Sequence, residues 1–156
     1  MRSQVLVVAL LLATVGSAAQ QSKPDFSGER VLNRQASTLS PTMAGIQSGR
    51  LVIQHREPKV SVHLTLVQNG QPFDTVIERT TDGREVAGTQ QGRSNPSSFK
   101  WDGNALVFSA RAQGQNCEGT VAIRYELEDS GRRIRASEVI RGCGRDQDNI
   151  WIFERP

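Results

Sequence analysis

Several features that would point to a particular function are scarce in this sequence. Aromatic residues make up 5% of the 156 residues, and no catalytic signature is present. The formal net charge is only +3 with both signs interspersed, so the chain lacks the concentrated basic stripe of a nucleic-acid-binding protein. Hydrophobic residues nevertheless reach 37%, which excludes a disordered tail. We therefore expect one folded domain without a nucleic-acid partner.

Long hydrophobic runs are absent except near the start of the chain. Residues 5–15 are apolar and follow the charged Arg2, but they are too few to span a bilayer comfortably. Small residues at 16–19 fit a signal-peptidase site. We expect residues 1–19 to be a signal peptide and residues 20–156 to form a single mature domain, with an uncut anchor as the alternative. The mature protein would be exported, to the periplasm or outside the cell, without inserting into the membrane.

Cysteine is also rare, since only Cys117 and Cys143 are present. An even number of cysteines usually pairs in an oxidising compartment, so export predicts a disulfide between them. The alternative is a metal site, but two thiols with no histidine nearby in the sequence are a poor ligand set. We expect no metal and no cofactor.

From residue 22 onwards, the sequence has no sustained 3.6-residue apolar period, which excludes long amphipathic helices. Apolar and polar residues alternate instead, as they do in half-buried β-strands. Dipeptides that favour tight turns separate these segments, namely Asn69-Gly70, Asp82-Gly83, Asp102-Gly103 and Ser130-Gly131. The pattern predicts an all-β domain built from antiparallel hairpins.

The hairpin registers can be tested, because paired residues keep a constant sum of residue numbers and face the same side. Each register gathers apolar residues on one face and leaves opposite charges, such as Glu126 and Arg135, on the other. The predicted pairs on the inner face include Ile53 with Val62, Leu66 with Phe73, Arg79 with Val86, Phe99 with Phe108, and Leu127 with Ile134.

About ten strands can be counted in simple up-and-down order, from residues 26–32 to residues 149–155. A sheet of so many antiparallel strands with one solvent-exposed face must either close into a barrel or leave its two edge strands unpaired, and closure removes the edges. We therefore predict an antiparallel up-and-down barrel, with a two-sheet sandwich as the alternative. Residues 33–49 fit no strand, so we expect a long loop after the first strand that crosses one barrel end as a plug or a gate.

The register of the last long hairpin places Cys117 opposite Gly144, which is one residue away from Cys143. A β-bulge at a neighbouring glycine, Gly119 or Gly142, would absorb the difference. We expect such a bulge beside the disulfide.

Four segments are informative when they are taken together. They are Pro24-Asp25-Phe26-Ser27-Gly28, the loop that follows, the TTDGRE segment at 80–85, and Lys100-Trp101-Asp102-Gly103-Asn104 followed by Ala105-Leu106-Val107. In this order they resemble bacterial exported lipocalin-like domains, in the calycin group of barrels. The resemblance implies a closed, lipocalin-like barrel with a cavity that binds small apolar molecules in relatives. Arg30 departs from the pattern, because relatives usually carry a Trp there that plugs the barrel base.

Polar residues on the predicted inner face are candidates for ligand binding. Ligand pockets combine apolar walls with a few polar groups, and an unpaired charge inside must be paired, solvated or at a mouth. We expect a small hydrophobic ligand with a polar end, contacted by His55, Arg79, Tyr125 and Glu138. Thr75 and Gln90 also fall on this face. The alternative is that Tyr125 belongs to the core and that Arg79 and Glu138 lie at the barrel ends.

An enzymatic function is not expected, because no nucleophile and base with an orienting acid are recognisable. His55 and His63 fall on opposite strand faces, which argues against a joint metal site. A second hypothesis is a protein-interaction or inhibitor domain that acts through loops at one rim, such as residues 93–98, and has a filled interior. A cavity of a few hundred Å³ would favour ligand binding instead. The sequence names no protein partner.

Overall fold

The computed structural model describes residues 22–90, 93–113 and 116–156. The predicted signal peptide, residues 1–19, lies outside the described residues. The described residues include two short 3₁₀ helices, η1 (Pro41–Met43) and η2 (Asp129–Gly131). No helix in the described residues is long and apolar enough to cross a membrane. The strands are β1 (Gly28–Leu32), β2 (Ile46–Arg56), β3 (Lys59–Gln68), β4 (Gln71–Thr80), β5 (Thr89–Gln90), β6 (Arg93–Ser94), β7 (Ser97–Asp102), β8 (Ala105–Gln113), β9 (Glu118–Glu128), β10 (Arg133–Gly142) and β11 (Gln147–Glu154).

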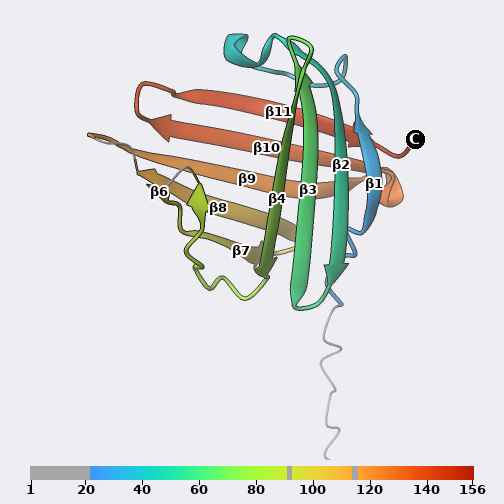
Figure 1. Cartoon of the computed structure of the whole chain (residues 1–156). Coiled ribbons are helices and arrows are strands. Elements are labelled where there is room, and N and C mark those ends of the chain that lie inside the picture. Colours follow the sequence, from blue (N-terminus) through green and yellow to red (C-terminus); the bar gives the residue numbers. More distant parts are fainter. Residues whose placement is uncertain (1–21, 91–92, 114–115) are drawn as a thin grey trace, which may run out of the picture.

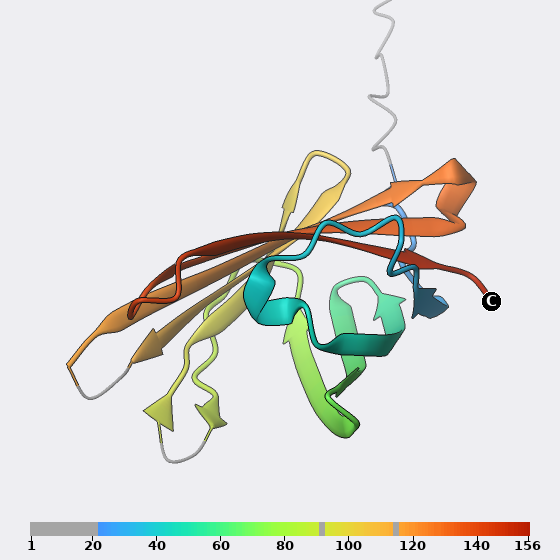
Figure 2. The same cartoon turned by 90° about the horizontal axis from the view of Figure 1, so that it is seen from above.

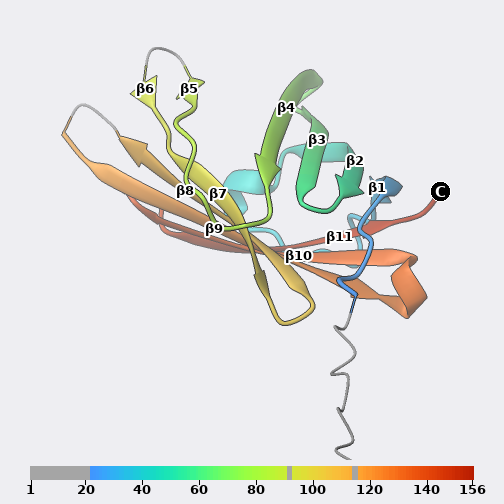
Figure 3. The same cartoon turned by 90° about the horizontal axis from the view of Figure 1, so that it is seen from below.

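Nine of the described strands form one antiparallel sheet that curls into a nearly closed barrel (Figure 1). Their order in the sheet is β4-β3-β2-β1-β11-β10-β9-β8-β7. Each strand therefore lies beside the strands that precede and follow it among these nine, except that β4 and β7 do not pair, and the first strand, β1, also pairs with the last, β11. The sheet stays open between β4 and β7, and the small β5–β6 hairpin stands on this open side (Figure 3). The predicted all-β up-and-down barrel is confirmed, with nine strands in place of about ten.

The predicted registers are confirmed in four hairpins, which join β2 to β3, β3 to β4, β7 to β8, and β9 to β10. Residues facing the interior alternate with residues facing solvent along each strand, because the side-chain period of a strand is two. The confirmed pairs are Ile53 with Val62, Leu66 with Phe73, Phe99 with Phe108, and Leu127 with Ile134.

One predicted hairpin, closed at Asp82-Gly83, is wrong. Val86 forms a bridge with Ser97 of β7 rather than with Arg79. The Asp82 carboxylate accepts a hydrogen bond from the backbone N–H of Arg84 (3.1 Å), and such a local turn leads the chain away from β4. The segment after β4 therefore pairs with β7 and does not extend the β3–β4 hairpin.

The hydrophobic core lies between the two halves of the curled sheet. Fully burying one aliphatic or aromatic side chain contributes roughly 1.5 to 3 kcal/mol, so these inward rows hold the barrel together. The buried core residues are Phe26, Ile46, Leu51, Ile53, Val60, Val62, Leu66, Phe99, Leu106, Phe108, Tyr125, Ile134, Ala136, Trp151 and Phe153.

Arg30 occupies the barrel base, where the lipocalin-like pattern has a Trp. Its side chain is completely buried, and the guanidinium donates hydrogen bonds to the carbonyl oxygens of Phe26 (3.1 Å) and Gly131 (2.8 Å). Burial, followed by the positive charge of Arg155, lowers the pKa of Arg30 below its ordinary value. The two backbone acceptors offset part of the cost of burying this cation.

The predicted disulfide between Cys117 and Cys143 is confirmed, with 5.4 Å between the α-carbons. The expected bulge is wrong, because the described β9–β10 register runs unbroken to Gly142 opposite Gly119. Gly142, Cys143 and Gly144 all have positive φ angles instead. This left-handed run turns the chain back at the end of β10 and brings Cys143 to Cys117.

Residues 33–45, which we call the lid loop, cross one end of the barrel and include η1 (Figure 2). Thr38 is bridged to Ile150 of β11, and Met43 packs against the core. The predicted long loop after the first strand is confirmed, although it ends earlier than residue 49 because β2 already begins at Ile46.

Candidate functional site

A cavity of about 260 Å³ lies inside the barrel, between the two halves of the sheet. Its walls are mostly apolar, and three polar side chains reach it: Thr75, Tyr125 and Glu138. An apolar cavity with few polar groups is the usual form of a small-molecule site. The other lining residues are Met43, Leu51, Val62, Leu64, Leu66, Phe73, Ile77, Phe108, Ile123, Ala136, Trp151 and Phe153.

Strand alternation and register bring the polar cavity residues together. Tyr125 of β9 is the cross-strand partner of Ala136 on β10, which in turn is paired with Trp151 on β11. Two residues further along β10, Glu138 is paired with Asn149. Because residues two apart share a face of the sheet, these side chains all point into the same end of the barrel.

Glu138 is a half-buried carboxylate held by neutral donors. Its Oε2 atom accepts hydrogen bonds from Asn149 Nδ2 (2.8 Å) and from the indole Nε1 of Trp151 (3.0 Å). Among the described residues, no Lys, Arg or His forms an ion pair with it. The two donors fix the orientation of the carboxylate, while its negative charge has no cationic partner in the described chain.

Tyr125 is the second polar group at this end of the cavity. Its side chain is 6% exposed, and the described residues offer its hydroxyl no hydrogen-bond partner within the chain. Burial, and then the negative charge of Glu138, raise the pKa of the Tyr125 hydroxyl. The hydroxyl is therefore protonated over the whole physiological range and is available to a bound molecule.

Asn149 links the cavity carboxylate to the lid loop. This side chain is only 2% exposed, and its Oδ1 accepts a hydrogen bond from the backbone N–H of Ser40 (2.7 Å). Its other end donates to Glu138. A buried amide that uses both ends is costly to disturb, so Asn149 couples the orientation of Glu138 to the position of the lid loop.

The open side of the barrel, between β4 and β7, forms a groove of about 420 Å³ that we call the seam. Thr75, Ile77 and Phe108 line both the seam and the cavity, so the two spaces adjoin. Phe73, which faces the cavity from the edge strand β4, is 52% exposed. The seam is therefore the side on which the cavity meets solvent.

Arg79 bridges the seam instead of entering the cavity. Its Nε and Nη2 atoms donate hydrogen bonds to the hydroxyl of Ser97 on β7, at 3.1 and 2.8 Å, and Nη1 donates to the carbonyl of Glu78 (2.7 Å). Ser97 is buried. Arg79 thus connects β4 to β7 by side-chain contacts, while the backbone of β7 is bridged to the segment that follows β4, at Asp82 and Val86.

His55 lies at the closed end of the barrel. Its Nδ1 atom accepts a hydrogen bond from the backbone N–H of Phe26 (3.4 Å), so Nε2 carries the proton and donates to Glu57 Oε1 (2.9 Å). Glu57 also accepts from Trp101 Nε1 and Thr81 Oγ1, each at 2.8 Å. His55 is therefore a buried structural residue in this network, and it does not line the cavity.

The Glu57 carboxylate has a shifted pKa. Burial by itself raises it, but the hydrogen bonds from His55, Thr81 and Trp101 together outweigh burial and lower the pKa of Glu57 below its ordinary value. Glu57 is thus ionised at neutral pH and joins the β2–β3 turn to the strands that pack beside it.

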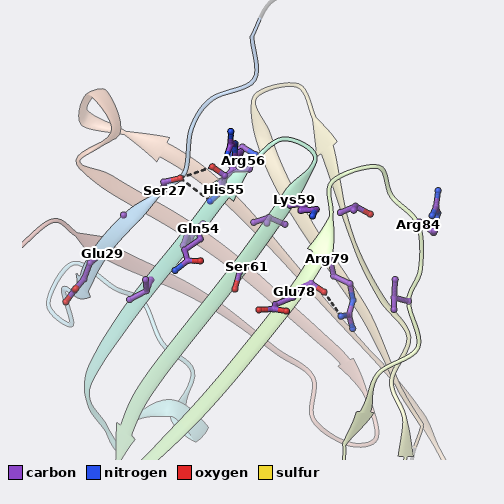
Figure 4. Close-up of a pocket in the computed structure, with 16 residues that line it drawn as sticks. Ser27, Glu29, Gln54, His55, Arg56, Lys59, Ser61, Glu78, Arg79 and Arg84 are labelled. Atoms are coloured by element: carbon purple, nitrogen blue, oxygen red, sulfur yellow. Dashed lines mark hydrogen bonds between the residues drawn. The ribbon is translucent and has the colours of Figure 1, made fainter.

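A second, larger hollow of about 1050 Å³ lies along the outer face of β2, β3 and β4 (Figure 4). Gln54, Ser61 and Glu78 are cross-strand neighbours there, and their side chains project from the three strands side by side (Figure 4). Most residues that line it are polar, and it opens widely to solvent. The interior cavity is the better candidate, because it is smaller, less open to solvent and more apolar.

The structure brings two of the four predicted site residues to the cavity, while the other two, His55 and Arg79, both line the larger hollow. Tyr125 and Glu138 line the cavity, whereas Arg79 lies at the seam and His55 at the base. Thr75 also lines the cavity, and the side chain of Gln90 lies outside the described residues. Sequence reasoning missed Asn149, although its alternation with Trp151 and Phe153 along the last strand would have placed it on the inner face.

The described residues contain no group of three or more side chains suited to a metal ion. The carboxylates and histidines are spread over the base, the outer face and the cavity, and they are engaged mostly in pairs.

No family model matches the chain, and no curated protein matches it in sequence. Solved structures do match. A secretory abundant heat soluble protein from Ramazzottius varieornatus aligns with a TM-score of 0.62 and 8% identity, covering 83% of this chain and 94% of that one. Human cRBP IV aligns with a TM-score of 0.57 and 16% identity, covering 85% and 99%.

A fatty acid-binding protein from brain tissue of Drosophila melanogaster also aligns, with a TM-score of 0.51, 14% identity, and coverage of 84% of this chain and 100% of that one. These barrels are of the calycin type, so the fold expected from the resemblance is confirmed. At identities this low the likeness concerns the fold alone.

Proposed function

We propose that this chain is an exported binding protein that holds a small apolar ligand inside its barrel. The observation that carries the proposal is the apolar interior cavity with Thr75, Tyr125 and Glu138 as its polar side chains. One of the similar folds is named as a fatty acid-binding protein. The hypothesis of an interaction domain expected a filled interior, which the cavity does not favour.

The binding test uses N-phenylnaphthylamine, a neutral apolar dye whose fluorescence rises when it binds in an apolar site that excludes water. Thr75→Phe places a ring on the cavity wall, and overpacking of this size costs roughly 1 to 3 kcal/mol. We expect the variant to bind the dye about ten-fold more weakly or worse. Val139→Phe is the matched control, because Val139 of β10 faces solvent with 37% exposure and lines neither the cavity nor the seam.

Dye binding that is lost in Thr75→Phe and kept in Val139→Phe supports an interior site. Equal binding by both variants and the unmodified protein would place the dye elsewhere on the surface and contradict the proposal. Failure of the unmodified protein to bind the dye or any apolar compound would contradict it as well.

Export is tested separately, by the intact mass and N-terminal sequence of protein recovered from its own cells. A mature chain that begins at Gln20 and is found outside the cytoplasm supports it. The oxidised Cys117–Cys143 pair agrees with an oxidising compartment. A chain that retains residues 1–19 in the cytoplasm would contradict export without affecting the binding proposal.

A further inference from the structure

We propose that the cavity selects ligands whose polar end is a protonated amine, with Glu138 as the partner of the ammonium group, over carboxylates of the same length. This inference rests on the proposed ligand-binding function, and it names the chemical class of the ligand head group.

The first observation is the state of the Glu138 carboxylate. Both of its hydrogen bonds within the described chain end on Oε2, so Oε1 remains free to accept from a ligand. Both donors are neutral groups of Asn149 and Trp151. This half-buried carboxylate is held in position but, among the described residues, has no cation beside it, so a cationic group on the ligand would stabilise its charge.

The second observation is the charge of the cavity wall. Its lining residues include one carboxylate and no Lys, Arg or His. The two cations that line the adjoining seam lie outside the cavity: Arg111 is paired with Glu85 (2.7 Å), and the guanidinium of Arg79 is held by the hydroxyl of Ser97 and the carbonyl of Glu78. A ligand carboxylate would lose its water without gaining a cation, and it would face the charge of Glu138.

The third observation is the Tyr125 hydroxyl, which is buried beside Glu138 and has no hydrogen-bond partner among the described residues. An ammonium group carries three donors and no acceptor. The free oxygen of Glu138 and the oxygen of Tyr125 can both accept from it. The two unpaired acceptors and the donors of one amine therefore match.

The experiment measures displacement of N-phenylnaphthylamine by three ligands that share a decyl chain: decylamine, decanol and decanoate, at neutral pH. We expect decylamine to bind the unmodified protein at least ten-fold more tightly than decanoate, since hydrogen bonds to charged groups are the stronger ones. In Glu138→Gln the preference should disappear, while decanol and the dye bind as before. Gln keeps an oxygen that can accept from Asn149 and Trp151.

The matched control is Glu78→Gln, which removes a carboxylate from the outer face of β4 and should leave all affinities unchanged. Equal binding of decylamine and decanoate by the unmodified protein would overturn the amine preference, and this comparison needs no variant. An amine preference that survives in a folded Glu138→Gln would overturn the role of Glu138. In both cases the ligand-binding function itself would stand, because the dye and decanol still bind; it fails only if none of the probes binds.

Discussion

Glu57 and Glu138 are both glutamates that accept an indole N–H, yet they do different things. Glu57 receives three donors, from His55, Thr81 and Trp101, and both of its oxygens are used. Glu138 receives two donors on one oxygen and faces a cavity. Glu57, with donors on both oxygens, stabilises the barrel base, whereas Glu138 keeps one oxygen free for a ligand.

The Glu57 network predicts a pH-dependent contribution to stability. Because the pKa of Glu57 is lower in the folded protein, the contribution is complete above the unfolded pKa of about 4.3 and is lost as the pH falls through the folded pKa. Glu57→Gln should therefore lower the free energy of unfolding at neutral pH, with a difference that shrinks below about pH 4. Urea unfolding across this pH range measures it.

The control for this prediction is Glu78→Gln, because Glu78 is exposed and its side chain forms no ion pair in the described residues. A stability difference for Glu57→Gln that stays constant down to acid pH would show that the lost interactions do not depend on the charge of Glu57.

Alternation along the strands was enough to predict that Tyr125 and Glu138 face the interior. It could not predict that the side chain of His55, on the same inner face, is already hydrogen-bonded to other residues of the chain. Its partner Glu57 sits in the β2–β3 turn, and the other donors to Glu57 come from residues 81 and 101, which only the folded barrel brings to that turn. A side chain's direction follows from local geometry, whereas its partners depend on distant segments.

At the scale of elements, hairpins with short turns were predictable because both strands and the turn are contiguous in sequence. The predicted Asp82-Gly83 hairpin failed, although its dipeptide is equally favourable. The turn does form, but β7 offers Val86 a partner at Ser97. Turn chemistry decides where the chain reverses, and competition between strands decides what it pairs with.

The end of β10 offers a test of backbone geometry. Gly142 and Gly144 both have positive φ angles, which cost other residues about 1 to 2 kcal/mol. A β-carbon on Gly142 would lie 2.3 Å from the carbonyl oxygen of Glu118, whereas one on Gly144 meets nothing within 4 Å. Gly142→Ala should therefore lose more than about 2 kcal/mol, and Gly144→Ala about 1 kcal/mol.

Urea denaturation of the two variants, with the disulfide oxidised, measures this difference. The crowding at Gly142 would also slow pairing of Cys117 with Cys143 during refolding, which a thiol count would detect. Equal losses for the two variants would mean that the end of β10 moves to accommodate the methyl group.

For the whole molecule, the important feature is that the barrel closes by backbone pairing everywhere except at the seam. There, Arg79 and Ser97 connect β4 and β7 through side chains. The adjoining cavity and seam share Thr75, Ile77 and Phe108. A ligand can therefore leave the cavity most easily between β4 and β7, since these two strands share no ladder hydrogen bonds and the backbone bridges of β7 end on Asp82 and Val86, beyond β4.

Arg79→Ala should consequently speed dissociation of N-phenylnaphthylamine several-fold, because it removes the charged hydrogen bonds to Ser97. Association should change less. Stopped-flow dilution of the dye complex measures both rates. Arg84→Ala is the control, since the Arg84 side chain is 78% exposed and, among the described residues, forms an ion pair only with Asp82, at 3.6 Å. The same acceleration in both variants would rule out the seam as the exit route.

The sequence by itself determined one β domain, the inner and outer faces of its strands, four of its hairpin registers, and the pairing of its two cysteines. These depend on contiguous segments, on side-chain period and on residue count. Only the tertiary structure decided that Arg30 is held by carbonyls at the base, that a cavity remains open, and that Glu138 has a free oxygen. The volume of a cavity and the polar atoms left without a partner depend on how distant segments pack together, so no single segment of the chain determines them.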